Sequence, residues 1–246
     1  MQTDHPGGDL RAEQLVLRGE GQAVPLEQPE QYGIERGRSR KAWTRRENES
    51  SPAEIDAEDA QLKQWAQATG NYVNHAAIDD LSKLADRVTK GTEHDVFIFS
   101  KRENPFVVRL TKLDMFGLPH RTPGEYIDRW RLSNAAFPDT KVSLIGYTEN
   151  ARGNGVILTS QRYFEGTKRD QKGIDAAFGK LGYQRIKGEG TRYRNSETGV
   201  EIHDAHTDNV IFDKSGNPIP FDVMLNDPND YFDMQDSELS WDQGLA

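Results

Sequence analysis

The fold is best predicted from the segment Ile202-His203-Asp204-Ala205-His206-Thr207-Asp208-Asn209-Val210-Ile211-Phe212-Asp213, which continues through residues 214–220 to Phe221-Asp222-Val223. Its apolar runs and polar interruptions predict a strand, a polar loop, a strand, a turn and a further strand. Two short strands joined by a tight turn bring their ends together. We therefore expect Asn209 and Asp222 at one end of a hairpin, with Asp204 on the loop that leads into it.

These three side chains are suited to phosphoryl transfer. An aspartate and an asparagine can bind Mg²⁺ through oxygen, while substrate phosphates and water complete the coordination shell. A second aspartate nearby can orient or deprotonate a hydroxyl group. Asp204, Asn209 and Asp222 therefore supply the minimum set of groups for moving a phosphoryl group to an alcohol.

The pattern Asp-x-His-x-x-Asn-Val-Ile at residues 204–211, followed by a hairpin and Asp222, resembles the catalytic and metal-binding loops of the protein-kinase-like superfamily. In this respect the pattern resembles the small-molecule kinases, such as aminoglycoside and choline kinases, in which a histidine follows the catalytic aspartate by two residues. Together with Gln161-Arg162-Tyr163-Phe164, the pattern most resembles the predicted serine/threonine/tyrosine kinase domain of polyvalent proteins of phages and conjugative elements. This resemblance covers residues 57–232.

The resemblance implies an α+β, two-lobed protein-kinase-like fold with an antiparallel-sheet N-lobe. We expect a reduced C-lobe, because residues 223–246 leave no room after Asp222 for a large helical lobe. ATP and Mg²⁺ are the implied cofactors, with Mg²⁺ held by Asp222 and Asn209. Asp204 would orient the acceptor hydroxyl and take up its proton. His206 would brace the loop through hydrogen bonds, the alternative being a role in proton transfer.

Composition favours one domain of moderate size with polar tails, because the 246 residues are 35% hydrophobic and 29% charged. The net charge of −9 argues against a dedicated nucleic-acid-binding protein, which normally has a basic surplus. The chain has no cysteine, so disulfides and thiolate chemistry are excluded. No apolar run approaches a membrane span and no signal-peptide core is evident, so we expect a soluble cytoplasmic protein.

The chain divides into a central domain and two tails. Residues 1–50 lack apolar periodicity and are expected to be disordered or weakly ordered, and residues 233–246 form an acidic tail. The basic run at 36–46 is expected to be a solvated linker, the alternative being a weak contact with nucleic acid or an acidic partner. The domain, 51–232, is divided into N-terminal helices, an N-lobe and a small C-lobe: 51–86, 87–160 and 161–232.

Two capping boxes predict helix starts. Ser51-Pro52-Ala53-Glu54 and Thr122-Pro123-Gly124-Glu125 each combine a capping hydroxyl, a proline at the first helical position and a closing glutamate. Glu58 and Asp59 interrupt the apolar face of the first helix, so its first turn is expected to be solvated and its second half to pack on the domain. The second helix is expected to end near Ala136.

Residues 87–112 are expected to form three strands. The segment Gly91-Thr92-Glu93-His94-Asp95 lies between the first two, where kinase-like proteins hold the loop over the ATP phosphates. Gly91 and Glu93 are therefore assigned to nucleotide binding, because backbone N–H groups there can approach a phosphate. The usual glycine repeat of the family is absent, and a plain turn is the alternative.

The third strand carries Arg109 where the kinase pattern has a lysine that holds the α and β phosphates. Arg109 is assigned to ATP, with Lys112 on the opposite face as the reserve; the alternative is that both are surface cations. Glu125 is the expected ion-pair partner of the strand cation, with Asp128 as the second choice. Either acid could instead stabilise the N-terminus of its helix.

Further strands are expected at 141–148 and 156–160, and the second leads into Gln161-Arg162-Tyr163. By resemblance this is the hinge, so Gln161 and Tyr163 are assigned to the nucleotide, with backbone groups of Arg162 and Tyr163 meeting adenine. An ordinary central strand has the same composition. The remaining expected elements are a helix at 172–181 with Leu181 on its buried side, short strands at 183–186, around Tyr193 and at 200–203, and a final strand at 221–225.

The predicted activity is ATP-dependent transfer of the γ-phosphate to a hydroxyl, either of a protein Ser, Thr or Tyr or of a small molecule. Two other classes remain open. A nucleotide-binding pseudokinase or scaffold module is suggested by Arg109 and by the single glycine of the phosphate loop. A metal-dependent hydrolase could bind a transition metal through His203, Asp204 and His206.

Overall fold

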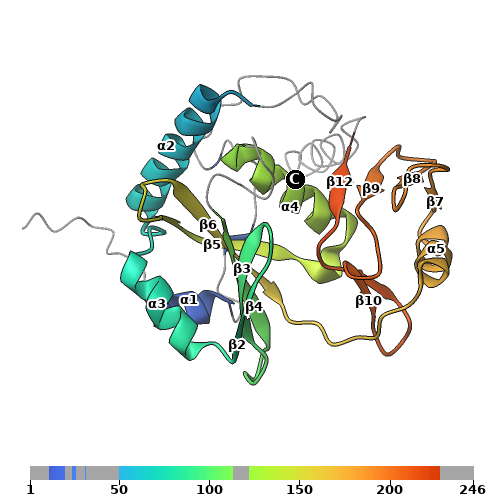
Figure 1. The fold of residues 1–246 in the computed structure, drawn as a ribbon, viewed down its shortest axis with the longest axis horizontal. Coiled ribbons are helices and arrows are strands. Elements are labelled where there is room, and N and C mark those ends of the chain that lie inside the picture. The colour runs from blue at the N-terminus through green and yellow to red at the C-terminus, as the bar shows by residue number, and fades with distance from the viewer. Residues whose placement is uncertain (1–10, 20–23, 26–30, 32–49, 113–121, 228–246) are drawn as a thin grey trace, which may run out of the picture. The chain divides into compact units, whose positions relative to one another are not determined.

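A computed structural model of the chain describes residues 11–19, 24–25, 31, 50–112 and 122–227 (Figure 1). The described residues fall into two compact units. Unit 1 contains those up to Arg131 together with residues 141–164, and unit 2 contains residues 132–140 and 165–227. The basic run at 36–46 and the acidic tail at 233–246 lie outside the described residues.

Unit 1 is built on a six-stranded antiparallel sheet with the strand order β1-β5-β6-β4-β3-β2 (Figure 1). Short connections join β2 to β3, β3 to β4 and β5 to β6, and each of these pairs is a hairpin. The five strands predicted between residues 87 and 160 are thereby confirmed. The strands are β1 (Val24–Pro25), β2 (Arg87–Lys90), β3 (His94–Phe99), β4 (Phe106–Thr111), β5 (Val142–Glu149) and β6 (Gly155–Arg162).

Helices cover both faces of this sheet. Helices α1 and α3 pack on one face, where Leu15 and Leu81 are buried, and α2 with the first part of α4 packs on the other, where Leu62 is buried. Leu144 and Ile145, neighbours in β5, belong to different cores because strand side chains alternate between faces. The four helices are α1 (Ala12–Leu17), α2 (Pro52–Thr69), α3 (His75–Leu84) and α4 (Pro123–Ala136).

The N-terminal segment differs from its prediction. A disordered or weakly ordered tail is expected over residues 1–50, but the described part contains α1 and β1. Ala12, Leu15 and Val16 share one side of α1 and are buried in the core of unit 1. The three buried residues of this six-residue helix form no periodic pattern that sequence analysis can detect. Burial against the sheet, rather than local propensity, therefore determines α1.

The predicted start of α2 is confirmed. Ser51 Oγ accepts a hydrogen bond from the Glu54 N–H at 3.3 Å, and the Glu54 carboxylate accepts one from the Ser51 N–H at 2.8 Å. Gly70 ends the helix with a left-handed φ of 70°, a conformation that favours glycine. The start and end of α2 are thus determined by local sequence.

Glu58 and Asp59 interrupt the apolar face of α2, as predicted, but both are partly buried and accept hydrogen bonds from other elements. Glu58 accepts a hydrogen bond from the Gly124 N–H at 2.9 Å. Asp59 accepts one from the Tyr147 hydroxyl at 2.9 Å and one from the Gly155 N–H at 3.2 Å. A Cβ at residue 155 would lie 1.8 Å from Asp59 Oδ1, so the absence of a side chain permits this approach. Two carboxylates therefore attach α2 to the start of α4 and to the β5–β6 hairpin.

Unit 2 contains a four-stranded antiparallel sheet, β12-β9-β8-β7, and the two-stranded hairpin β10–β11. The C-terminal part of α4 and helix α5 share a core with these strands, in which Phe178, Tyr193, Ile202 and Phe212 are buried. The elements are α5 (Gln171–Lys180), β7 (Tyr183–Arg185), β8 (Tyr193–Asn195), β9 (Glu201–His203), β10 (Val210–Phe212), β11 (Pro218–Pro220) and β12 (Met224–Asn226), with a 3₁₀ turn at Pro138–Thr140.

Two details of unit 2 differ from their predictions. Leu181 is exposed rather than buried, because α5 ends at Lys180 and Leu181 lies beyond its last turn. The final strand begins at Met224 instead of Phe221, because Phe221 still bonds to the hairpin. The predicted fold class, α+β with antiparallel sheets, is confirmed. None of the helices in the described ranges combines the length and apolar character needed to cross a bilayer.

Replacing Glu58 with glutamine is expected to change how stability depends on pH. Burial, the largest effect, raises the pKa of Glu58, although hydrogen bonds from Thr122 and Gly124 lower it. Because this pKa is raised in the folded state, the stability contributed by its protonation is present at low pH and is lost as the pH rises through the folded-state pKa.

The free energy of unfolding of Glu58→Gln should therefore exceed that of the unmodified chain near pH 7. This difference in free energy should shrink as the pH falls toward about pH 4.5. Urea unfolding across this range measures it. Asp56→Asn is the matched control, because Asp56 is exposed on the same helix, and its difference from the unmodified chain should be small and nearly constant. A Glu58→Gln advantage that grows as the pH falls would contradict the buried position of Glu58.

Candidate active site

The loop between β9 and β10, residues 204–209, begins with an unusual backbone conformation. Asp204 has a φ of 59° and is the one non-glycine residue of the described chain in the left-handed region. The following residue, Ala205, is fully buried; its N–H donates to the Thr191 carbonyl at 3.1 Å, and its carbonyl accepts from Gln171 Nε2 at 3.0 Å. Ala205 is thus held from two sides, and Asp204 stays at the surface with 49% of its side chain exposed.

Asn209 closes the loop onto Asp204. Its side-chain Nδ2 donates to the carbonyl oxygen and to Oδ2 of Asp204, both at 2.9 Å, and its N–H donates to the His206 carbonyl at 3.0 Å. Because Nδ2 is used in this way, Oδ1 is the Asn209 atom that remains to bind a cation. An amide oxygen beside a carboxylate is a donor set that suits Mg²⁺, so these residues fit the metal that the resemblance implies.

His206 lies between two acidic residues of the loop. Its Nε2 is 3.4 Å from Asp204 Oδ1, and its Nδ1 accepts a hydrogen bond from the Asp208 N–H at 3.1 Å. Because Nδ1 is an acceptor, the proton of the neutral ring is on Nε2, on the side of Asp204. This arrangement suits the bracing role that we predict for His206.

Asp222 lies at the same end of the hairpin as Asn209. Strands β10 and β11 pair from Val210↔Pro220 to Phe212↔Pro218, and the Phe221 N–H donates to the Asn209 carbonyl at 3.1 Å. Asp222 follows directly and is half-buried. The predicted hairpin is thus confirmed, and it carries Asn209 and Asp222 on its two open ends.

The residues assigned to the nucleotide belong to unit 1. Glu93 lies on the turn between β2 and β3 and forms an ion pair with Arg129 of α4 at 2.8 Å. The Gly91 N–H donates to the His94 carbonyl at 2.8 Å, and the Gly91 carbonyl accepts from Lys112. The predicted turn is therefore present, and the ion pair between Glu93 and Arg129 connects it to α4. The residues assigned to the nucleotide are Gly91, Glu93, Arg109, Glu125, Gln161 and Tyr163.

Arg109 is buried on β4, so it is not a surface cation. Its guanidinium lies over the Trp130 ring, 5.2 Å from the centroid, and donates to Oε1 of Gln161. The guanidinium of Arg129 lies over the same ring at 5.0 Å. Trp130 therefore carries two stacked cations, an arrangement stabilised by the negative face of the indole ring.

An ion pair connects α4 with the sheet: Arg129 of the helix supplies the cation, and Glu93 of the β2–β3 turn supplies the acid. The predicted pair between Arg109 of β4 and an acid of this helix, Glu125 or Asp128, stays a prediction. Glu125 accepts a hydrogen bond from the Thr122 N–H at 2.9 Å and closes the capping box of α4. This is the alternative role considered for Glu125.

The remaining unit 1 candidates contact the sheet, the turn before β4 or their own helix. The backbone of Gln161 pairs with Val107 on one side and Val142 on the other, so it lies inside the sheet. The Tyr163 N–H donates to the Pro105 carbonyl at 2.9 Å. Adenine binding at Tyr163 would therefore have to use its carbonyl group. Asp128 accepts a hydrogen bond from Arg131 of the same helix at 3.3 Å.

Several residues that contact the candidate site residues or their neighbours cannot be recognised from any sequence pattern. Gln171 and Thr191 fix Ala205 from outside the candidate loop. His94 is buried, with Nε2 3.0 Å from the Tyr126 hydroxyl, and burial followed by nearby arginine and lysine charges lowers its pKa to about 2. These residues contact partners far away in the chain, and such contacts leave no pattern of spacing.

The transition-metal alternative is contradicted by the geometry. Within the ranges that the structure describes, no group of three or more His, Cys, Asp and Glu residues is arranged to hold a metal ion. His203 Nε2 faces Glu201 at 3.1 Å, whereas His206 Nε2 is near Asp204. A Mg²⁺ ion that takes most of its ligands from a nucleotide and water needs no such group.

Comparison with known families identifies the class of the chain. A family model described as "Serine/Threonine/Tyrosine Kinase found in polyvalent proteins" matches residues 56–225. The chain belongs to this kinase family, as its resemblance predicts, and membership implies a kinase-like fold and the use of a nucleotide. Searches of curated proteins and of solved structures found no match.

Replacing Asp204 with valine is expected to destabilise the protein by about 1–3 kcal/mol, because a β-branched residue is strained at a φ of 59°. Asp204→Asn should cost less than about 1 kcal/mol, because asparagine tolerates the left-handed region. Urea unfolding measures both. Asp208→Val is the control at an exposed position of the same loop, and it should be milder than Asp204→Val. Equal stability of the two Asp204 variants would contradict a constrained backbone.

Proposed function

We propose that this protein is an ATP-dependent phosphotransferase that moves the γ-phosphate of ATP to the hydroxyl of a serine, threonine or tyrosine in a protein. The observation that carries the proposal is the Asp204–Asn209 loop, closed by two hydrogen bonds and followed by the hairpin that ends at Asp222. The family description supplies the acceptor class. A small-molecule hydroxyl is the other acceptor to test.

In this proposal, the residues of unit 2 divide the chemistry between them. Asn209 Oδ1 and the Asp222 carboxylate hold Mg²⁺, which when bound neutralises charge on the ATP phosphates. Asp204 Oδ2 accepts from Asn209, so Oδ1 is the atom proposed to orient the acceptor hydroxyl and to receive its proton. His206, with Nε2 beside Oδ1, keeps the carboxylate in this orientation. Positioning and charge neutralisation supply most of the rate.

Unit 1 is the proposed N-lobe and unit 2 the proposed small C-lobe of a two-lobed kinase. Gly91 and Glu93 are proposed to border the phosphates, and Arg109 to supply the cation of the β4 strand. Gln161 and Tyr163 are proposed for the adenine side. Glu125 supports this set through the capping box of α4. We place the activity in the cytoplasm, with no membrane partner and with nucleic acid at most a weak contact of the basic run at 36–46.

One observation favours a second candidate, a pseudokinase that binds a nucleotide without transferring phosphate. The Arg109 guanidinium is buried, stacks on Trp130 and donates to Gln161. An arginine fork held in this way is larger and less mobile than a lysine ammonium group. If it stays there when ATP binds, the β4 cation does not reach the phosphates, and transfer would be lost while Mg²⁺-dependent binding remained.

The deciding experiment incubates the purified chain with γ-labelled ATP, Mg²⁺ and an unstructured protein rich in Ser, Thr and Tyr. We expect labelled protein, and a loss of at least about 100-fold in Asp222→Ala and in Asp204→Asn, because each removes a group that acts in the transfer. Asp204→Asn should still bind Mg·ATP by thermal shift. Asp213→Asn is the control; the Asp213 carboxylate accepts hydrogen bonds within the hairpin turn, chiefly from Asn217, so this variant should keep its activity.

The other outcomes separate the candidates. Mg²⁺-dependent nucleotide binding without any transfer or ATP hydrolysis would favour the pseudokinase. Label on an added aminoglycoside or choline, but not on protein, would favour a small-molecule acceptor. Absence of both binding and transfer would refute the proposed function.

A further inference from the structure

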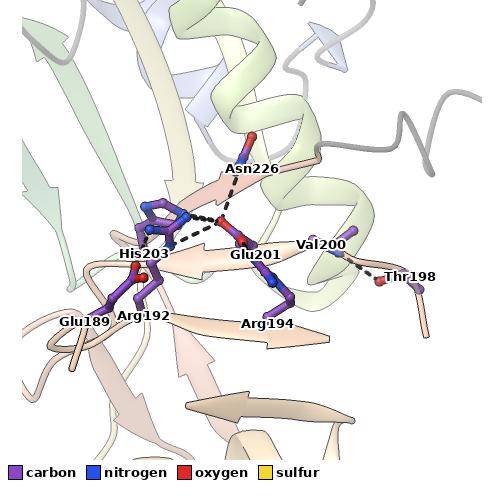
Figure 2. Close-up of polar contacts among 8 residues, drawn as sticks. All are labelled: Glu189, Arg192, Arg194, Thr198, Val200, Glu201, His203 and Asn226. Carbon is purple, nitrogen blue, oxygen red and sulfur yellow. Dashed lines mark hydrogen bonds and ion pairs between the residues drawn. The ribbon is translucent and has the colours of Figure 1, made fainter. Parts of the chain in front are cut away.

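Glu201 is a buried, charged side chain in the four-stranded sheet of unit 2 (Figure 2). Only 2% of its side chain is exposed. Burial by itself raises the pKa of Glu201, but hydrogen bonds, chiefly from Arg192 and Arg194, outweigh burial and lower the pKa to about 2. The carboxylate is therefore ionised at neutral pH, inside the protein.

Three strands meet at this carboxylate, as Figure 2 shows. Arg192, directly before β8, donates to Oε2 from Nη2 at 2.5 Å and from Nε at 3.2 Å, and Arg194 of β8 donates to Oε1 from Nε at 2.7 Å. On β9 itself, His203 Nε2 is 3.1 Å from Oε2. On β12, Asn226 Nδ2 donates to Oε2 at 3.4 Å. One side chain thus links β8, β9 and β12.

The strand pair that Glu201 links carries two residues of the candidate site. Strands β9 and β12 are antiparallel, with Asn226 opposite Glu201 and Met224 opposite His203. Asp204 follows His203, and Asp222 lies two residues before Met224. Both aspartates therefore leave the strand pair at the same end. The register of β9 against β12 determines how they are offset from each other.

A shift of register by one residue would move every side chain of a strand to the opposite face. The Glu201–Asn226 hydrogen bond joins directly opposed residues, so it is compatible with the observed register and not with the shifted one. The bond from Glu201 to His203 also fixes the ring directly before Asp204. Glu201 therefore acts on both strands that lead to the site.

Stability alone does not explain a charge at this position. The opposite face of the same strands already packs Tyr193, Ile202 and Leu225 into the core. A buried ion cluster often stabilises a fold no better than apolar residues of the same size, because desolvation offsets the attraction between the charges. The ion cluster differs from apolar packing in that its hydrogen bonds require specific distances and directions between the groups.

We propose that Glu201 is a positioning residue for phosphoryl transfer, which fixes the β9–β12 register and thereby the offset between Asp204 and Asp222. The inference rests on the proposed function and names a residue that acts through its neighbours. Its link to β12 matters for the site, whereas its link to β8 matters only for the stability of the sheet.

Three variants test this division. Glu201→Gln removes the charge, Asn226→Ala removes only the link to β12, and Arg194→Ala removes a link to β8 from a side chain that is 58% exposed. Transfer is measured per folded molecule, with the folded fraction taken from circular dichroism. We expect kcat to fall about 10-fold or more in Glu201→Gln and several-fold in Asn226→Ala, with a higher Mg²⁺ concentration at half-maximal rate. Arg194→Ala should leave both quantities unchanged.

A purely structural role predicts a different result. All three variants would then contain less folded protein, but kcat per folded molecule and the Mg²⁺ dependence would match the unmodified chain. That outcome would overturn the proposal, as would an equal loss of kcat in Asn226→Ala and Arg194→Ala.

Hydrogen exchange gives a readout that does not depend on activity. Glu201→Gln and Asn226→Ala should speed exchange in the segments 203–210 and 221–227 together, and Arg194→Ala only in the β7–β8 hairpin. If the unmodified chain neither binds nor uses a nucleotide, the proposed function fails, and this measurement still decides whether Glu201 holds the two strand ends. Unchanged exchange in both segments would refute the proposal.

Discussion

The arrangement of unit 2 depends on one backbone constraint, the left-handed turn at Asp204 between a strand and a buried alanine. Ala205 is held by hydrogen bonds to Thr191 and Gln171, so the chain cannot continue straight out of β9. The turn leaves the Asp204 carboxylate exposed and directs the chain toward Asn209, which bonds back to it. From there the hairpin returns the chain to β12. A strained residue held by rigid neighbours is a common feature of functional sites.

Both units hold their functional candidates with buried charges that have specific partners. In unit 1, Trp130 carries Arg109 and Arg129, and Arg129 reaches Glu93 on the β2–β3 turn. In unit 2, Glu201 joins three strands. Such groups would be costly if they lacked partners, because the protein interior does not replace water well. Their partners must therefore stay in place, and the loops next to these partners are held in position as well.

Local patterns predicted the elements that local interactions stabilise. Short-range spacing predicted the capping boxes of α2 and α4, the three strands between 87 and 112 and the β10–β11 hairpin. Caps and tight turns involve residues only a few positions apart, so their patterns are visible in the sequence. Predictions failed where distant contacts decide. Helix α1 forms through burial against the sheet, and Glu58 and Asp59, which interrupt the apolar face of α2, accept hydrogen bonds from other elements.

The sequence by itself determined the family, the α+β class and the order of Asp204, His206, Asn209 and Asp222 along a loop and hairpin, since these follow from residue type and spacing. Only the tertiary structure decided which side chains meet. It paired Arg109 with Gln161 and Trp130, Glu93 with Arg129, and Glu201 with three strands. The physical reason is that these partners lie at no fixed spacing along the chain, so no sequence pattern identifies them. The energy of each contact also depends on burial, which only the complete fold creates.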